Sequence, residues 1–137
     1  MVRYLVATHG VLAKGFESAL QILLGNLDNI EFISCYVDDS NTQKQIEEFI
    51  NSIGDDQLIM FSDICGGSVN QIMNQYLQRE NTYQVTGVNL AVLIEMLATN
   101  KDSYSKKELE MIVANAKDNL QLVNLQIDVS EEEEDFF

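Results

Sequence analysis

The sequence predicts one α/β domain with a doubly wound, mainly parallel sheet, helices on both faces and flavodoxin-like strand order. Short, continuously apolar runs are typical of parallel strands buried on both faces. These runs alternate with longer segments whose apolar residues recur at helical spacing, a pattern typical of strands joined by right-handed helical crossovers. The chain has 137 residues, 46% of them hydrophobic, which is enough for one such core.

The first half of the chain contains two strand–helix units. Apolar runs predict strands at Val2–Thr8 and Ile30–Val37. A helix follows each strand, and Gly25 and Gly54 are placed to end these helices. We expect two apolar stripes to face the sheet: Leu12, Phe16, Ala19, Leu20 and Leu23 in the first helix, and Ile46, Phe49, Ile50 and Ile53 in the second.

The second half continues the alternation. Two strands and three helices are predicted there: strands at Leu58–Phe61 and Tyr83–Val88, and helices over Val69–Leu77, Leu90–Ala98 and Ser105–Leu120. Ser105 and Glu108 have the spacing of a capping box at the start of the last helix. The expected inward positions are Val69, Ile72, Met73, Tyr76 and Leu77, followed by Leu90, Leu93, Ile94 and Leu97.

The last predicted strand, Val123–Val129, differs because apolar and polar residues alternate strictly in it. This alternation is typical of a strand with one face in water, so we expect a C-terminal edge strand. An edge strand at a chain terminus is free to pair with a second copy, which predicts a homodimer. We expect the domain to span residues 1–129, followed by an acidic tail at residues 130–137 with a composition typical of disorder.

Charge and composition exclude several classes of function. The formal net charge of −14 opposes nucleic acid and anionic membranes as partners, leaving either a basic protein partner or acidity that only aids solubility. No segment approaches the roughly 20 apolar residues of a membrane span, and the N-terminus lacks a signal peptide, so we expect a cytoplasmic protein. Cys35 and Cys65 form no CxxC pair and His9 is the only histidine, so no metal site is expected. No cofactor is expected either.

Two polar residues stand where predicted strands end. His9 follows the first strand and Asp63 follows the third, and these strands are neighbours in flavodoxin-like order. A carboxylate that accepts the Nδ1 proton of an imidazole leaves the Nε2 lone pair free and stabilises the ring once it is cationic. We therefore expect His9 to be a nucleophile oriented by Asp63, although a strand-end aspartate is as often a helix cap.

A glycine-rich segment, Gly66-Gly67-Ser68, follows Asp63 and opens the next predicted helix. Such a segment allows backbone N–H groups to approach an anion closely, and the Ser68 hydroxyl adds a donor. We expect these three residues to bind a phosphoryl group, although a plain turn and a simple cap are the alternatives. Together, the nucleophile, the orienting carboxylate and the anion site suit phosphoryl transfer.

Four blocks carry a resemblance to a known family: Thr8-His9-Gly10, Leu23-Leu24-Gly25, Asp63-Ile64-Cys65-Gly66-Gly67-Ser68 and Gly87-Val88-Asn89-Leu90. They resemble the enzyme IIA component of the mannose-family sugar phosphotransferase system, in order and spacing, over residues 1 to 129. The resemblance implies that His9 takes a phosphoryl group from HPr and passes it to a IIB component. It also implies that Asp63 bonds the active histidine, that Ser68 and the two glycines hold the phosphoryl oxygens, and that the protein dimerises through an exchanged edge strand.

The sequence departs from the family pattern at the rim of this site. Cys65 stands where many members have an aromatic residue, Val69 stands where many have proline, and the chain contains no proline. Because of these departures, the resemblance does not indicate which sugar is transported. Three apolar residues near the site, Val11, Leu12 and Ile64, are candidates for docking a carrier with a basic rim, with burial in the core as the alternative, favoured for Leu12 by its helical stripe.

Other classes of function remain open on this architecture. A flavin- or phosphate-binding domain and a receiver phosphorylated on Asp63 share the fold class. Against them, Thr8-His9 replaces a receiver's acidic pair, and no aromatic residue flanks the two glycines. A regulatory module that is switched by phosphorylation of His9, without onward transfer, is the main alternative.

Overall fold

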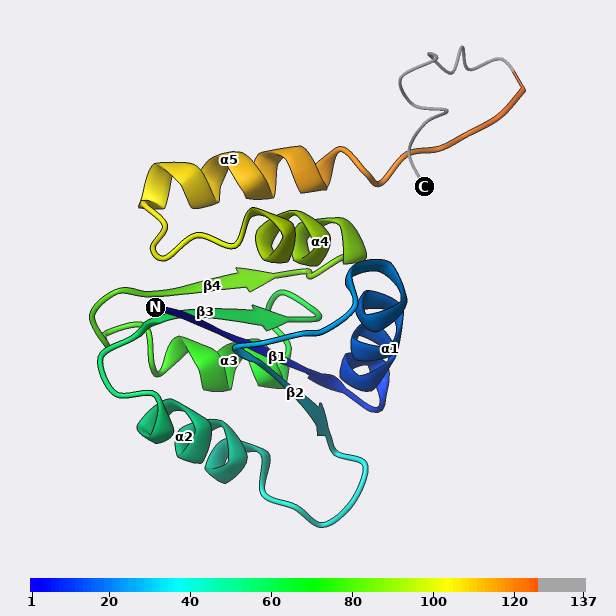
Figure 1. Cartoon of the computed structure of the whole chain (residues 1–137). Coiled ribbons are helices and arrows are strands. Elements are labelled where there is room, and N and C mark those ends of the chain that lie inside the picture. Colours follow the sequence, from blue (N-terminus) through cyan, green and yellow to red (C-terminus); the bar gives the residue numbers. More distant parts are fainter. Residues whose placement is uncertain (126–137) are drawn as a thin grey trace.

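The computed structural model describes residues 1–125. Its sheet has four parallel strands in the order β2-β1-β3-β4, as predicted for a doubly wound fold (Figure 1). The strands are β1 (Val2–His9), β2 (Ile30–Cys35), β3 (Gln57–Ser62) and β4 (Thr82–Thr86). Because β1 and β3 are adjacent, the loops that follow them meet at the point where the chain reverses its winding direction.

Helices cover both faces of this sheet (Figure 1). In the described residues they are α1 (Leu12–Leu24), α2 (Thr42–Ser52), α3 (Ser68–Asn74), α4 (Leu90–Thr99) and α5 (Lys106–Lys117). Residues of α1, α4 and α5 share one core cluster, and residues of α2 and α3 share the other. The prediction of a parallel sheet between two helical layers is therefore confirmed.

The central strand β1 shows why the strands are apolar throughout. Tyr4 and Val6 point into the cluster below α1 and α4, whereas Leu5 and Ala7 point into the cluster below α2 and α3. Successive side chains of a strand alternate between the faces of a sheet. Since both faces of this sheet are covered, each of these positions must be apolar, and the run reads as continuous.

The predicted stripe of α1 is correct in its middle, where Leu20 is buried and Phe16 packs against the core, but not at its two ends. Leu12 is 46% exposed and Leu23 is 39% exposed, so the expectation that they face the core is wrong. Leu20, which belongs to the predicted stripe, is fully buried, and so is Ala13, which does not belong to it. The Thr8 hydroxyl accepts a hydrogen bond from the backbone N–H of Ala13 at 2.7 Å, which fixes the first turn with Ala13 against the sheet. Leu12 is thereby left on the surface near His9.

The C-terminal helices follow the predictions more closely. Ser105 and Glu108 form both hydrogen bonds of the capping box at the start of α5. In α4, the predicted Leu93 is buried, but Val92 and Met96 are buried as well. An apolar stripe wider than one helix face is expected where a helix packs against more than one neighbour, and α4 contacts both α1 and α5.

The predicted edge strand Val123–Val129 falls largely outside the described residues. The part that is described, residues 123–125, is exposed and is not in a strand. The acidic tail at residues 130–137 also lies outside the described residues. Within the described part of the chain, no helix is long and apolar enough to cross a membrane.

Candidate functional site

His9 is the last residue of β1 and lies at the carboxyl end of the sheet, the end at which the parallel strands finish. Its side chain is 43% exposed, although the preceding residues of the strand are buried. Gly10 follows with a φ of +59°, a value that glycine adopts without strain, and its N–H donates to the Cys35 carbonyl oxygen at 2.9 Å. The chain therefore turns away directly after His9 and leaves the imidazole open to solvent.

Asp63 follows β3 directly and contacts His9 from the neighbouring strand. Its Oδ2 lies 2.9 Å from the imidazole Nδ1 and also accepts the His9 backbone N–H at 2.9 Å. Its Oδ1 accepts the backbone N–H of Ile64 at 3.1 Å. An ionised carboxylate can only accept hydrogen bonds, so Nδ1 carries the proton and the neutral ring has its lone pair on Nε2.

The charge of Asp63 is maintained by these contacts. Burial raises the pKa of this carboxyl, whose side chain is only 8% exposed, but the hydrogen bonds from the backbone and ring of His9 lower the pKa by more. The pKa of Asp63 consequently lies below its ordinary value, and the group is a carboxylate at neutral pH. A fixed negative charge next to Nδ1 stabilises positive charge on the ring.

Ser68 lies on the other side of the imidazole. Its Oγ is 3.2 Å from His9 Nε2, so the hydroxyl faces the nitrogen that Asp63 leaves free. Ser68 is the first residue of α3, and the N-cap position is occupied by Gly67. Ser68 is therefore not a simple N-cap residue, which was the alternative interpretation of its hydroxyl.

The two glycines allow the backbone to pass close to the His9 side chain. Gly66 has a φ of +81°, in the left-handed region that favours glycine. A Cβ on Gly67 would lie 3.3 Å from the Ile64 carbonyl oxygen and 3.5 Å from Cε1 of His9. A side chain at this position would therefore be tight against the Ile64 carbonyl oxygen and would contact the imidazole.

The N–H groups of these glycines already have acceptors. The Gly66 N–H donates to Asn70 Oδ1 at 2.9 Å, and the Gly67 N–H donates to the Ile64 carbonyl oxygen at 3.1 Å. Of the three predicted phosphoryl-binding residues, Ser68 is thus the one whose donor faces Nε2 in this structure. The predicted residues His9, Asp63, Gly66, Gly67 and Ser68 do lie together at one end of the sheet.

Tyr36 joins this group and was missed by the sequence analysis. It follows β2 directly, its hydroxyl donates to Ser68 Oγ at 2.9 Å, and its ring centroid lies 5.4 Å from that of His9. Its φ of +64° is unusual for a bulky residue. In the sequence, Tyr36 falls inside the apolar run Ile30–Val37, where it reads as a core residue.

Hydrogen bonds of Asn70 and Gln84, which the sequence did not predict, hold the glycine segment in place. Asn70 accepts the Gly66 N–H and donates through Nδ2 to Gln84 Oε1 at 2.8 Å. The same Gln84 oxygen accepts from the Ser62 hydroxyl at 2.8 Å. The glycine turn is therefore tied to β3 and β4 by polar side chains that show no periodicity in the sequence.

The cysteines stand apart from this chemistry. Cys65 is exposed beside the glycines, and Cys35 is buried, which raises the pKa of its thiol. Among residues 1–125, no cluster of three His, Cys, Asp or Glu side chains could hold a metal ion.

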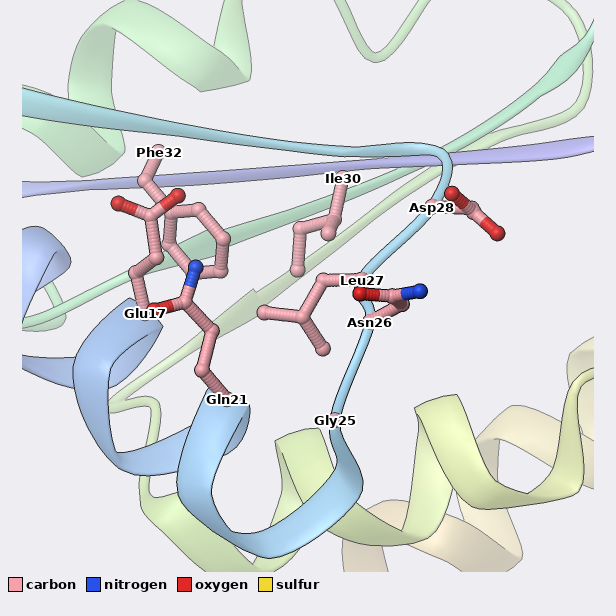
Figure 2. Close-up of a pocket in the computed structure, with 8 residues that line it drawn as sticks. All are labelled: Glu17, Gln21, Gly25, Asn26, Leu27, Asp28, Ile30 and Phe32. Atoms are coloured by element: carbon pink, nitrogen blue, oxygen red, sulfur yellow. The ribbon is translucent and has the colours of Figure 1, made fainter.

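A cavity of about 440 Å³ lies between α1 and β2, and Figure 2 shows the residues that line it. Its lining comprises Glu17, Gln21, Gly25, Asn26, Leu27, Asp28, Ile30 and Phe32. The segment 25–28 leads into the amino end of β2, so this cavity lies at the opposite end of the sheet from His9. None of the predicted site residues lines it.

Comparison with known proteins gives a consistent answer. A model of the PTS system fructose IIA component family, EIIA-man, matches residues 3–113. A solved structure of a Klebsiella pneumoniae protein, assigned as a phosphoenolpyruvate-dependent sugar phosphotransferase system (PTS) permease, is 28% identical with a TM-score of 0.83. That match covers 88% of this chain and 90% of the other.

Two further solved structures extend this likeness. A PTS IIA protein associated with the fucose utilization operon from Streptococcus pneumoniae is 26% identical, with a TM-score of 0.76 over 88% of this chain and 92% of the other. The mannose/sorbose specific IIA subunit from Enterococcus faecalis shares the fold at 17% identity, with a TM-score of 0.72 over 93% and 98% of the two chains. No curated protein matches the chain. Since the family model covers most of the sequence, the chain belongs to the EIIA-man family of PTS IIA components.

Proposed function

We propose that the protein is a histidine phosphoryl carrier, in which His9 accepts a phosphoryl group from phospho-HPr and passes it to a IIB component for sugar uptake and phosphorylation. The observation that carries this proposal is the line of contacts through His9. Asp63 Oδ2 lies 2.9 Å from Nδ1 and Ser68 Oγ lies 3.2 Å from Nε2. This arrangement exposes one nitrogen as a nucleophile and provides both a counter-charge and a donor.

Each transfer step is a displacement at phosphorus. The Nε2 lone pair of His9 forms the new N–P bond while the donor's N–P bond breaks, and that electron pair returns to the donor histidine. The Nδ1 proton stays in place, and Asp63 stabilises the positive charge that develops on the ring. Onward transfer to IIB reverses these roles, so no nucleotide or metal ion takes part in this scheme.

The phosphoryl oxygens need donors near Nε2. The Ser68 hydroxyl is directly available, because it already lies beside that nitrogen. The N–H groups of Gly66 and Gly67 would have to exchange their present acceptors for phosphoryl oxygens. We therefore assign the glycines chiefly to close backbone approach and Ser68 to direct contact.

Exposed apolar residues that follow His9 and Asp63 closely in the sequence suit docking of a carrier protein. Val11, Leu12 and Ile64 are 70%, 46% and 60% exposed, so the alternative of burial in the core does not apply to them. The net charge of −14 favours partners with basic rims and accelerates their encounter. We expect the rate of transfer from phospho-HPr to fall steeply with salt, and a flat response would argue against electrostatic docking.

The test of the carrier function is an intact-mass measurement after incubation with phosphoenolpyruvate, enzyme I and HPr. The wild-type chain should gain one acid-labile phosphoryl group, and His9→Ala should gain none. Addition of the IIB component should then discharge the wild-type protein. Absence of an adduct on the wild type would overturn the proposal, and an adduct that IIB cannot remove would favour a regulatory module.

We also propose that the chain acts in the cytoplasm as a homodimer that uses the segment 123–129. Two observations support this proposal: β4 is an outer strand of the sheet in the described residues, and the sequence of that segment alternates between apolar and polar residues. Sedimentation analysis should give a dimer for the full chain and a monomer for a chain cut after Leu120. A truncated chain that still sediments as a full dimer would contradict it.

A further inference from the structure

Tyr36 occupies a strained position at the carboxyl end of β2. Its φ of +64° lies in the left-handed region, where a bulky side chain is rare and raises the energy of the folded state. The residue is also 53% exposed, so burial does not compensate for this conformation. When an exposed tyrosine keeps a strained backbone, the position of its ring and hydroxyl is expected to serve a function.

This backbone conformation gives Tyr36 two contacts with the candidate site. The ring lies against the imidazole of His9, with a centroid distance of 5.4 Å and an interplanar angle of 38°. The hydroxyl donates to Ser68 Oγ at 2.9 Å. One side chain thus reaches both the nucleophile and the hydroxyl beside it.

The hydrogen bonds along this line have one consistent direction. A serine hydroxyl has a single hydrogen and two lone pairs. Donation from Tyr36 occupies one lone pair of Ser68 Oγ, so the Ser68 hydrogen is free to point at Nε2 of His9, 3.2 Å away. At the other end, Asp63 holds the proton on Nδ1.

We infer that Tyr36 is a positioning residue for phosphoryl transfer: it keeps the Ser68 hydroxyl hydrogen on the Nε2 side, where the hydrogen turns to an oxygen of the phosphoryl group as the N–P bond forms. The inference rests on the proposed carrier function. Because the N–H groups of Gly66 and Gly67 are already bonded, the hydroxyl of Ser68 is the donor that needs orienting. Two hydroxyls donating in sequence also polarise each other, which strengthens the bond to the developing negative charge.

The test compares single-turnover phosphorylation of the wild type and Tyr36→Phe over a range of phospho-HPr concentrations. Tyr36→Phe keeps the ring and removes only the hydroxyl. The maximal rate constant should fall by about three- to ten-fold, the effect of one hydrogen bond, while the half-saturating phospho-HPr concentration stays unchanged. A matched control, Tyr83→Phe on β4, removes a tyrosine hydroxyl away from the site and should leave both parameters unchanged.

A double-mutant cycle with Ser68→Ala identifies the route of the effect. Since Tyr36 acts through Ser68, Tyr36→Phe should have no further effect on the maximal rate in the Ser68→Ala background. An unchanged maximal rate in the single variant, equal losses in both backgrounds, or a change confined to half-saturation would overturn the inference while leaving the carrier function intact. A wild-type chain that is not phosphorylated would overturn both.

Discussion

The two ends of the parallel sheet use the same unusual backbone conformation in different ways. At the amino end, where the strands begin, Asn29 and Asn81 have φ values of +64° and +55°. Asparagine is among the residues that tolerate this region. Their carbonyl oxygens accept N–H groups of the neighbouring strands, from Tyr4 at 2.8 Å and Leu58 at 3.1 Å, and so extend the sheet. At the carboxyl end, Tyr36 has the same φ as Asn29.

The two ends of the sheet also differ in the groups that their hydrogen bonds join. At the amino end, Arg79 Nη2 donates to the carbonyl oxygens of Gly54 and Asp56, at 2.6 and 2.7 Å, and ties loops together. At the carboxyl end, Asp63 accepts two backbone N–H groups, and three further contacts join side chain to side chain around an exposed imidazole. The contacts at the amino end therefore stabilise the fold, whereas those at the carboxyl end hold the side chains of the candidate site in place, with backbone strain at Tyr36.

The largest effect is expected for Asp63→Asn at the carboxyl end. The amide favours the wrong tautomer of His9 and cannot stabilise the cationic ring, so phosphorylation should slow by about 100-fold or more. Rapid-quench measurement of phosphoryl transfer from phospho-HPr, with circular dichroism to check the fold, tests this. Asp56→Asn at the amino end is the matched control and should keep the wild-type rate. Unchanged kinetics in Asp63→Asn would remove the orienting role.

Arg79→Ala should separate stability from activity at the amino end. The substitution leaves the Gly54 and Asp56 carbonyl oxygens without their partner and should lower the free energy of unfolding by about 1–2 kcal/mol. Urea denaturation measures this loss. The rate of His9 phosphorylation at low temperature should stay at the wild-type value. A stable variant that transfers slowly would reverse the division between the two ends.

Exchanging tyrosine and asparagine between positions 36 and 29, which both have a left-handed backbone, tests the role of backbone strain. Tyr36→Asn should keep or raise the free energy of unfolding, by up to about 1 kcal/mol, because asparagine tolerates this φ. Phosphoryl transfer should nevertheless slow. The reciprocal change, Asn29→Tyr, should destabilise the protein by about 1 kcal/mol and leave transfer unchanged. Urea denaturation of both variants provides the comparison, and a destabilised Tyr36→Asn would show that Tyr36 is there for packing.

Much of the fold was predictable because it depends on local pattern. Buried parallel strands must be apolar at every position, and the Ser105–Glu108 capping box needs only the right spacing. The meeting of His9 and Asp63 was also predictable, since the adjacency of β1 and β3 follows from the winding of the chain. Leu12 was wrongly placed in the core because the Thr8 hydroxyl, not periodicity, fixes the first turn of α1.

Tyr36 and the support of the glycine turn could not be predicted in this way. The place of Tyr36 depends on one backbone dihedral angle beyond the end of β2, and apolar periodicity does not encode such an angle. Asn70 and Gln84 are brought together by the pairing of β3 with β4 and by the angle of α3. Neither residue stands out in the sequence as anything but polar.

The smallest expected effect is on the pH dependence of stability. The pKa of Asp63 is lower in the folded protein than its ordinary value, which is about 4, so Asp63 stabilises the fold above that pH. This contribution should be lost as the pH falls through the folded pKa, because the carboxyl must then be protonated in both states. Urea denaturation of the wild type and of Asp63→Asn at a series of pH values isolates it from the other carboxylates.

The difference in free energy of unfolding between the wild type and Asp63→Asn should be constant from neutral pH down to about 4 and should shrink below that. Asp38→Asn is a suitable control, because hydrogen bonds from Ser40 lower the pKa of that exposed carboxyl without any contact to His9. Both aspartates should therefore show the same sign of pH dependence, but only Asp63→Asn should also slow transfer. If the Asp63 difference grew as the pH fell, the carboxyl would be protonated in the folded protein, and the counter-charge at Nδ1 would be lost with it.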